Sequence, residues 1–247
     1  MTSHQEIYKE INEITKKLIL IGLSDQQNFP SCTQTGKGSY KIAYSGMQDL
    51  SIVLKNVDYK EMYKELDINH NYNVKMIDGA LIQLMYTYKK SSLISHRLAF
   101  FPSPFLENFQ NEPEIYENDE IYADIIAKNI LPVPIRFDYD PDNHQELDHP
   151  KSHLTLGQFK NCRIPVCSPI APSTFISFIL RSFYNTAFQK FTDQLTFSTK
   201  LFDKTITPGE KKLLHIAIER SNYLKSDCIG MIKPQKPQRP QSHRRGR

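Results

Sequence analysis

Residues 72–101 read YNVKMIDGALIQLMYTYKKSSLISHRLAFF, and this stretch decides the kind of fold. Two runs rich in apolar and aromatic residues, 72–76 and 80–88, flank the Asp-Gly pair at 78–79. Asp-Gly between two such runs is a strong signal for a tight turn that joins antiparallel strands. A third run of the same type, 93–101, follows and ends before two prolines. The stretch therefore predicts neighbouring antiparallel strands.

The residues before this stretch predict a long helix, a loop and further short elements. Isoleucine and leucine recur at three- and four-residue steps over residues 4–21, which is typical of an amphipathic helix. Residues 24–38 hold Ser, Asn, Pro, Gly and Thr, and we expect a loop there. Strands are expected at 40–44 and 50–54, and a short helix at 58–67.

The residues after this stretch predict three further helices. One is expected within the acidic, Asn-rich segment 105–130. Ser173 is a suitable N-cap for the second, an almost wholly apolar helix at 174–189. The third is expected at 207–219, where Pro208 suits the first turn.

The elements together predict an α+β fold. With further strands expected at 135–139 and 152–156, we predict a mostly antiparallel sheet of about seven strands with helices packed on it. No change in composition divides residues 1–230, so we expect a single α+β domain there. Residues 231–247 are predicted to form a disordered, basic, Pro-rich tail.

Charge is distributed unevenly along the 247 residues. The net charge is +4, but residues 233–247 hold six basic residues and no acidic one. Without them the chain has 25 basic and 27 acidic residues, so the body is nearly neutral. The tail either serves solubility or contacts nucleic acid through phosphate charge.

Composition also limits the class of protein. No run of 18 apolar residues exists, and the N-terminus lacks the basic and apolar regions of a signal peptide. The four cysteines are scattered and match no structural zinc spacing. We therefore expect a cytoplasmic protein with no membrane partner, no cofactor and no bound metal.

Residues 136–163 are the segment most able to carry chemistry. Three of the eight histidines, His144, His149 and His153, fall within ten residues, and carboxylates, Arg and Lys surround them. Titratable residues gathered on a loop between two strands are typical of functional sites.

Two metal sites are alternatives for this segment. Asp138, Asp140 and Asp142 have the spacing that begins an EF-hand loop, but the glycine and the closing glutamate of that loop are missing. The three histidines together with Asp148 supply zinc ligand types, although a strand at 152–156 separates His149 and His153 too widely for one ion.

The third alternative is acid–base cleavage of a phosphodiester without metal. Imidazoles titrate near neutral pH, so His149 and His153 are candidates for the acid–base pair. Arg136, or Arg97, is the candidate for stabilising phosphate charge. We assign Asp138 or Asp140 to orienting a histidine, and Thr155 to phosphate contact. His153-Leu154-Thr155-Leu156 matches the motif of two-histidine phosphoesterases, but the second copy that this family requires is absent.

A purely structural role for the same residues is the competing interpretation. Asp, Asn and Pro favour turns, and His153 can be a hydrogen-bonded core residue. The protein is then a non-catalytic accessory or recognition module of a multi-protein system, whose basic tail binds nucleic acid or an acidic partner.

Several blocks resemble one bacterial family. They are 95–104 (SHRLAFFPSP), 134–140 (PIRFDYD), 149–157 (HPKSHLTLG) and 161–166 (NCRIPV), followed by Pro172. The chain is identified on them as a member of domain-of-unknown-function family 2290, over about residues 10–220. The resemblance implies no activity. A looser similarity is to toxins of bacterial toxin–antitoxin systems, some of which attack RNA. Our leading hypothesis is a defence- or toxin-type ribonuclease or phosphodiesterase, whose partners are RNA or another nucleic acid and a protein encoded by a neighbouring gene.

Overall fold

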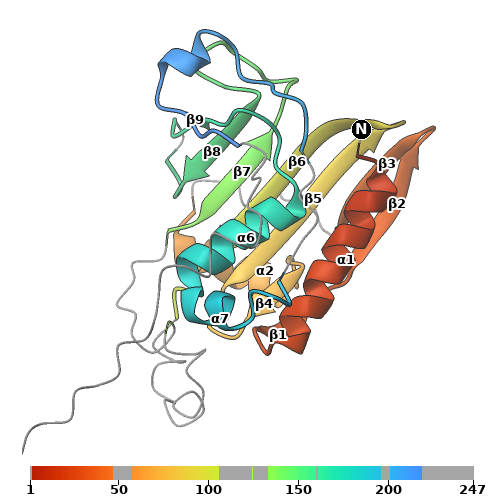
Figure 1. The fold of residues 1–247 in the computed structure, drawn as a ribbon, viewed down its shortest axis with the longest axis vertical. Coiled ribbons are helices and arrows are strands. Elements are labelled where there is room, and N and C mark those ends of the chain that lie inside the picture. The colour runs from red at the N-terminus through yellow and green to blue at the C-terminus, as the bar shows by residue number, and fades with distance from the viewer. Residues whose placement is uncertain are drawn as a thin grey trace, which may run out of the picture.

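The computed structural model describes residues 2–46, 57–105, 124, 133–159, 161–195 and 201–218. Within them, nine strands form one sheet, and helices pack against it (Figure 1). The strands are β1 (Ser24–Gln27), β2 (Pro30–Gly36), β3 (Ser39–Tyr44), β4 (Val74–Met76), β5 (Leu81–Lys89), β6 (Ser92–Phe101), β7 (Ile135–Tyr139), β8 (Ser152–Leu156) and β9 (Ile164–Pro165). The helices are α1 (His4–Leu20), α2 (Tyr59–Ile68), α6 (Pro172–Phe183), α7 (Asn185–Lys190) and the 3₁₀ turn η3 (Glu210–Lys212).

Every pairing between these strands is antiparallel, as the sequence predicts. The main order is β1-β4-β5-β6-β7-β8-β9. β5 is long enough to pair with β4 near its start and with β3 near its end, while β6 follows its other edge. β2 then pairs with β3. The α+β fold with a mostly antiparallel sheet is confirmed.

The hairpin at 78–79 joins β4 to β5. Gly79 has φ +77°, a conformation that a residue without a side chain adopts at little cost. The Ala80 amide donates to Oδ1 of Asp78 at 3.1 Å, which is the local hydrogen bond that favours Asp in turns. The helices predicted at 4–21 and 58–67 are also confirmed, as α1 and α2.

The prediction of a loop at 24–38 is wrong. β1 and β2 lie there, and together with β9 they are the three described strands that were not predicted from the sequence. β2 exposes most of its residues, so it lacks the alternation of apolar and polar residues by which a strand is recognised. Its backbone hydrogen bonds with β3 hold it in the sheet.

The helix predicted at 174–189 is two helices, α6 and α7, separated at Tyr184. The backbone leaves the helical region there (φ −133°, ψ 47°), and the Tyr184 phenol reaches the Asp78 carboxylate, with oxygen distances of 2.8 and 2.9 Å. Ser173 is not the N-cap, which is Ala171. The Ser173 amide instead donates to Oε1 of Glu10 on α1 at 2.9 Å. Tertiary hydrogen bonds therefore set both ends of α6.

The prediction of a helix at 207–219 is also wrong, because only the short turn η3 forms there. Ile216 pairs in extended conformation with the segment after β9. Its amide donates to the Pro165 carbonyl at 2.8 Å, and its carbonyl accepts from the Cys167 amide at 2.9 Å. Pairing with a distant segment outweighs the local preference for helix.

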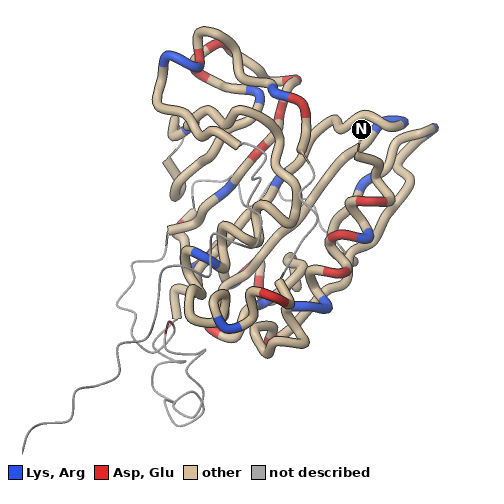
Figure 2. Tube along the Cα trace, viewed as in Figure 1, with Lys and Arg blue, Asp and Glu red and all other residues tan. Residues whose placement is uncertain are grey.

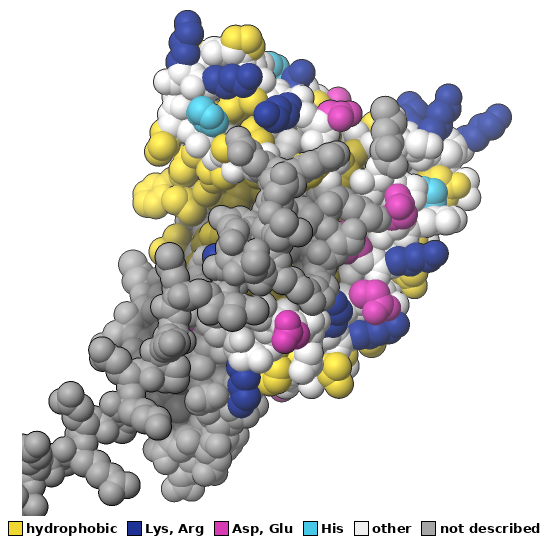
Figure 3. Space-filling view, in the orientation of Figure 1, with side chains coloured by type: hydrophobic (Ala, Val, Ile, Leu, Met, Phe, Trp, Pro, Cys, Tyr) yellow, Lys and Arg dark blue, Asp and Glu magenta, His cyan; other side chains and the backbone are white. Residues whose placement is uncertain are grey.

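The two faces of the sheet are covered differently. α1 and α6 lie over one face (Figure 1) and enclose the larger core, which includes Ile11, Leu84, Phe137 and Phe175. α2 covers only part of the other face, with a smaller cluster around Met62 and Leu81. Lys or Arg and Asp or Glu side chains follow one another along α1 (Figure 2 and Figure 3), so its outer surface has mixed charge. The part of the second face beyond α2 carries the polar residues described next.

Some predictions fall outside the described residues. They are the strand at 50–54, the helix within 105–130, except for residue 124, and the tail at 231–247. In the parts of the chain that are described, we find no helix with the length and apolar character that crossing a membrane requires.

Candidate functional site

Three polar residues stand side by side on three neighbouring strands. The register places Arg97 of β6 opposite Asp138 of β7, and Asp138 opposite His153 of β8. Residues directly opposite one another in an antiparallel sheet point to the same face. Their chain neighbours Phe137 and Leu154 belong to the large core on the other face. Alternation along the strands therefore places the three side chains together on the face that α2 leaves open.

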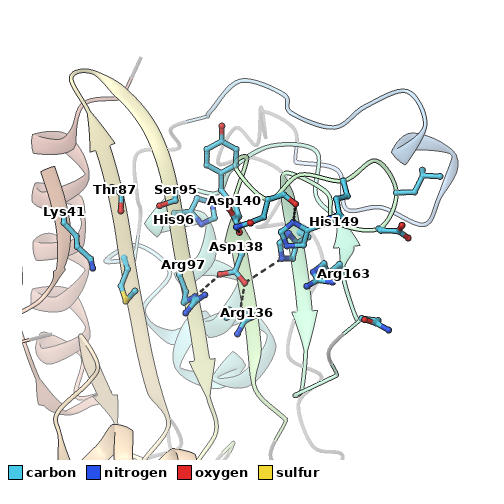
Figure 4. A pocket seen from close by; sticks show the side chains of 18 residues that line it. Lys41, Thr87, Ser95, His96, Arg97, Arg136, Asp138, Asp140, His149 and Arg163 are labelled. Atoms are coloured by element: carbon cyan, nitrogen blue, oxygen red, sulfur yellow. Dashed lines mark hydrogen bonds and ion pairs between the residues drawn. The ribbon is translucent and has the colours of Figure 1, made fainter. Parts of the chain in front are cut away.

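Asp138 is held between two guanidinium groups. Nε of Arg97 lies 3.0 Å from Oδ1 of Asp138, and Nε of Arg136, two residues away on β7, lies 2.6 Å from Oδ2 (Figure 4). Burial raises the pKa of Asp138, but the two arginines outweigh it and hold that pKa below its usual value. Both arginine side chains are about a quarter exposed. Their η nitrogens have no hydrogen-bond partner in the described part of the chain.

His153 is buried beside this carboxylate with a defined tautomer. Its Nδ1 lies 2.8 Å from the Pro150 carbonyl oxygen, which only accepts, so Nδ1 carries the proton of the neutral ring. Nε2 lies 3.8 Å from Oδ2 of Asp138, beyond hydrogen-bond length. Burial lowers the pKa of His153, and the nearby Asp138 charge opposes that shift without reversing it. The neutral ring therefore has an unprotonated Nε2.

His149 is held in the same way on the loop that precedes β8. Its Nδ1 donates to the Asn143 carbonyl at 2.7 Å, and the Asn143 side-chain amide donates to Oδ2 of Asp140 at 2.8 Å. The backbones of Gln145 and His149 exchange hydrogen bonds of 3.0 and 2.8 Å, which closes the loop. The His149 and His153 rings lie 4.8 Å apart between centroids. Two imidazoles, each with Nε2 unused by these bonds, are thus neighbours.

These side chains line a cavity of about 1020 Å³. Residues of β3, β5, β6, β7 and β8 form its floor, and residues of the loop 140–149 together with Asn161 and Arg163 close one side (Figure 4). Four cationic side chains line it, those of Lys41, Arg97, Arg136 and Arg163, and so do three carboxylates, those of Asp138, Asp140 and Asp148. The volume lies at the upper end of the range for small-molecule sites.

A family match covers this region together with most of the chain. The family described as "Uncharacterized conserved protein (DUF2290)" matches residues 23–218, which include every residue that lines the cavity. The chain belongs to DUF2290. The resemblance found in the sequence is thereby confirmed. Comparison with curated proteins and with solved structures gave no match.

Among the residues assigned to acid–base cleavage, Thr155 alone does not line the cavity of this DUF2290 protein. It lies opposite Arg136 in the β7–β8 register but is only 7% exposed. The other candidates, His149, His153, Arg136, Asp138 and Asp140, all line it.

His144 is separated from the other two loop histidines by its contacts. Its Nε2 lies 3.3 Å from the buried Glu210 carboxylate, which also accepts from the Thr207 amide at 2.8 Å. Glu146 accepts from the Thr207 hydroxyl at 2.7 Å. These contacts attach the loop to the η3 segment. Among the described residues, no three His, Cys, Asp or Glu side chains are arranged so that they could hold a metal ion.

Sequence inspection did not single out two of the four cations, Lys41 and Arg163, and it could not place Arg97 beside the histidines. Lys41 alternates with the apolar residues of β3, which signals only that it faces away from Ile42. That β3 lies beside β5, and so reaches the cavity, follows from strand pairing and has no local signal.

Proposed function

We propose that this DUF2290 protein cleaves RNA without a metal ion and that His149 and His153 are its acid–base pair. The observation that carries the proposal is the pair of imidazoles with centroids 4.8 Å apart, each held by an Nδ1 hydrogen bond to a carbonyl. Both rings lie in one cavity with two guanidinium groups. An acid, a base and a cation are the groups that RNA cleavage needs.

We assign the role of the base to the buried ring. Because burial lowers the pKa of His153, its Nε2 is free to take the proton of a ribose 2′-hydroxyl. The 2′-oxygen then attacks phosphorus, and the bond from phosphorus to the 5′-oxygen breaks. His149, in its imidazolium form, gives its Nε2 proton to the departing 5′-oxygen and becomes neutral. The products are a 2′,3′-cyclic phosphate and a 5′-hydroxyl, and the imidazoles have exchanged protonation states.

The charged residues support these steps. The η nitrogens of Arg97 and Arg136 face the growing negative charge on the phosphoryl oxygens. Asp138 fixes both guanidinium groups through their Nε atoms. Its carboxylate, 3.8 Å from Nε2 of His153, stabilises the imidazolium that forms when this histidine takes the proton.

The test is cleavage of end-labelled RNA by the full-length protein in the presence of EDTA. We expect breakage that leaves cyclic phosphate ends and that does not occur with 2′-deoxy substrate. His149→Ala and His153→Ala should each lower the rate by about 10²–10⁴-fold. His70→Ala is the matched control, because His70 is exposed and does not line the cavity.

Two outcomes would replace the proposal. Cleavage abolished by EDTA and restored by one divalent ion would indicate a metal-dependent hydrolase. RNA that is bound but left intact would favour the non-catalytic recognition module, especially if deleting residues 233–247 abolishes the binding.

A further inference from the structure

The polar face continues from the histidines towards the opposite side of the sheet. Lys41 of β3 lies opposite Thr87 of β5, and Thr87 lies opposite Ser95 of β6. Ser95 is two residues from Arg97 and therefore shares its face. Lys41, Thr87 and Ser95 all line the cavity, and Figure 4 shows them leading away from Arg97 towards β3.

The length of this track exceeds that of one phosphodiester. Neighbouring strands lie about 4.8 Å apart, so the four steps from β8 to β3 span about 19 Å. A stacked nucleic-acid strand rises only about 3.4 Å per nucleotide. A ligand that touches both His153 and Lys41 is therefore several nucleotides long.

The charges follow the same track. Arg97 and Arg136 are already paired with Asp138 near its centre. Lys41 and Arg163, which come from strand β3 and from the segment before β9, form no ion pair with any residue that the structure describes. Both are partly exposed. Unpaired cations away from the central pair suit a ligand with several phosphates rather than a single one.

We infer that the cavity takes a single-stranded RNA several nucleotides long, which crosses the strands from β8 to β3, and that Lys41 contacts a phosphate remote from the cleaved bond. The inference rests on the proposed function for the position of the cleaved bond. A cavity of about 1020 Å³ holds a few nucleotides of one strand. Lys41 is thus a residue that determines preference for substrate length.

The experiment measures binding separately from cleavage. The probe is a fluorescein-labelled 2′-O-methyl octauridylate, which has no free 2′-hydroxyl to attack, and its anisotropy is followed against the full-length protein over a range of salt concentrations. For Lys41→Gln we expect affinity to fall at least threefold and the slope of log K against log salt to become shallower by about 0.7, the loss of one phosphate contact. Lys37→Gln, on the exposed turn between β2 and β3, is the matched control and should bind as the wild type does.

Cleavage gives the second measurement. Lys41→Gln should lower kcat/KM for an octanucleotide by a larger factor than for a dinucleotide. The inference would be overturned if Lys41→Gln bound the octamer with wild-type affinity, or if its kcat/KM fell by the same factor for both substrates. An RNA duplex that competes as well as the single strand would also overturn it.

Failure of the proposed function would give a different combination of binding and cleavage results. If the wild type binds the probe in a Lys41-dependent manner but cleaves no RNA, the catalytic proposal is wrong and the binding track stands. If His149→Ala/His153→Ala abolishes cleavage while Lys41→Gln changes neither affinity nor length preference, the catalytic proposal stands and the track is wrong. Neither Lys41 nor Lys37 is buried, so thermal unfolding of each variant should match that of the wild type, which would show that the fold is kept.

Discussion

His96 and His153 are both buried, but they lie on opposite faces of the same sheet and have different surroundings. On the face that α1 and α6 cover, Nε2 of His96 accepts the Ile170 amide at 3.0 Å. On the other face, Nδ1 of His153 is held by the Pro150 carbonyl, and Nε2 lies 3.8 Å from the Asp138 carboxylate, beyond hydrogen-bond length. Both histidines are among the residues that line the cavity. The nitrogen of His96 that could act as a base is thus occupied by the backbone, whereas that of His153 is left available. Since both histidines are buried, the role proposed for His153 depends on the difference at this second nitrogen.

The largest effect is expected on the apolar face. Phe137→Ala removes a ring that packs edge-on against Phe175 and Phe178 and should lower the free energy of unfolding by about 3–5 kcal/mol. Urea unfolding followed by circular dichroism measures the change. Asp138, the next residue, lies on the other face. If Phe137→Ala lowered the free energy of unfolding by less than Asp138→Asn does, the view that the α1 and α6 face carries the stability would be contradicted.

The next effect concerns pH and His96. Burial lowers its pKa from 6.5 to about 4, so the unfolded chain binds the proton more readily than the folded one. The free energy of unfolding is therefore highest above pH 6.5, where His96 is neutral in both states. It falls by about 3 kcal/mol as the pH drops from 6.5 towards 4. Unfolding measured between pH 4 and 7 tests this.

His96→Leu is the comparison variant for that measurement. It should be less stable at pH 7, because the Ile170 amide loses its acceptor, and it should show a smaller loss on acidification. His153 contributes to the same pH range, since burial lowers its pKa too. If the free energy of unfolding of His96→Leu fell with pH as steeply as that of the wild type, His96 would not be the group responsible.

A smaller effect is expected for the carboxylate on the polar face. Asp138→Asn removes the charge shared by two guanidinium groups and should lower the free energy of unfolding by about 2 kcal/mol at pH 7. The loss is smaller than for a fully buried ion pair, because both arginines are partly exposed. The substitution should also lower the pKa of His153 further, which NMR titration of the imidazole measures. An unchanged or raised His153 pKa would refute the electrostatic coupling of the two residues.

Among these variants, replacement of Asp140 is expected to change stability least, but it should lower the activity. Its carboxylate contacts Asn143 on an exposed loop, so Asp140→Ala should change the free energy of unfolding by less than about 0.5 kcal/mol. Because Asn143 holds His149, the rate of RNA cleavage should fall by about tenfold, as small displacements of a catalytic group are costly. Asp142→Ala, on the same loop, is the control. Equal rates for both variants would show that Asp140 does not position His149.

Local signals were sufficient for much of this protein. The Asp-Gly pair at 78–79 and the apolar runs around it predicted β4, β5 and β6, and helical periodicity predicted α1. The DUF2290 blocks were recognisable, and the cluster of histidines marked the loop that lines the cavity. Each of these features lies within a few consecutive residues, where side-chain pattern and backbone preference act directly.

The tertiary structure decided the rest, because strand pairing and burial join residues far apart in the chain. β2 is a strand only because β3 offers it hydrogen bonds, and the break between α6 and α7 lies at the residue whose phenol reaches Asp78. Arg97 and His153 flank Asp138 through two pairings whose register no local pattern encodes. Lys41 joins the same face through β5. The sequence by itself determined which residues were available for chemistry, and the register of the sheet determined which of them meet.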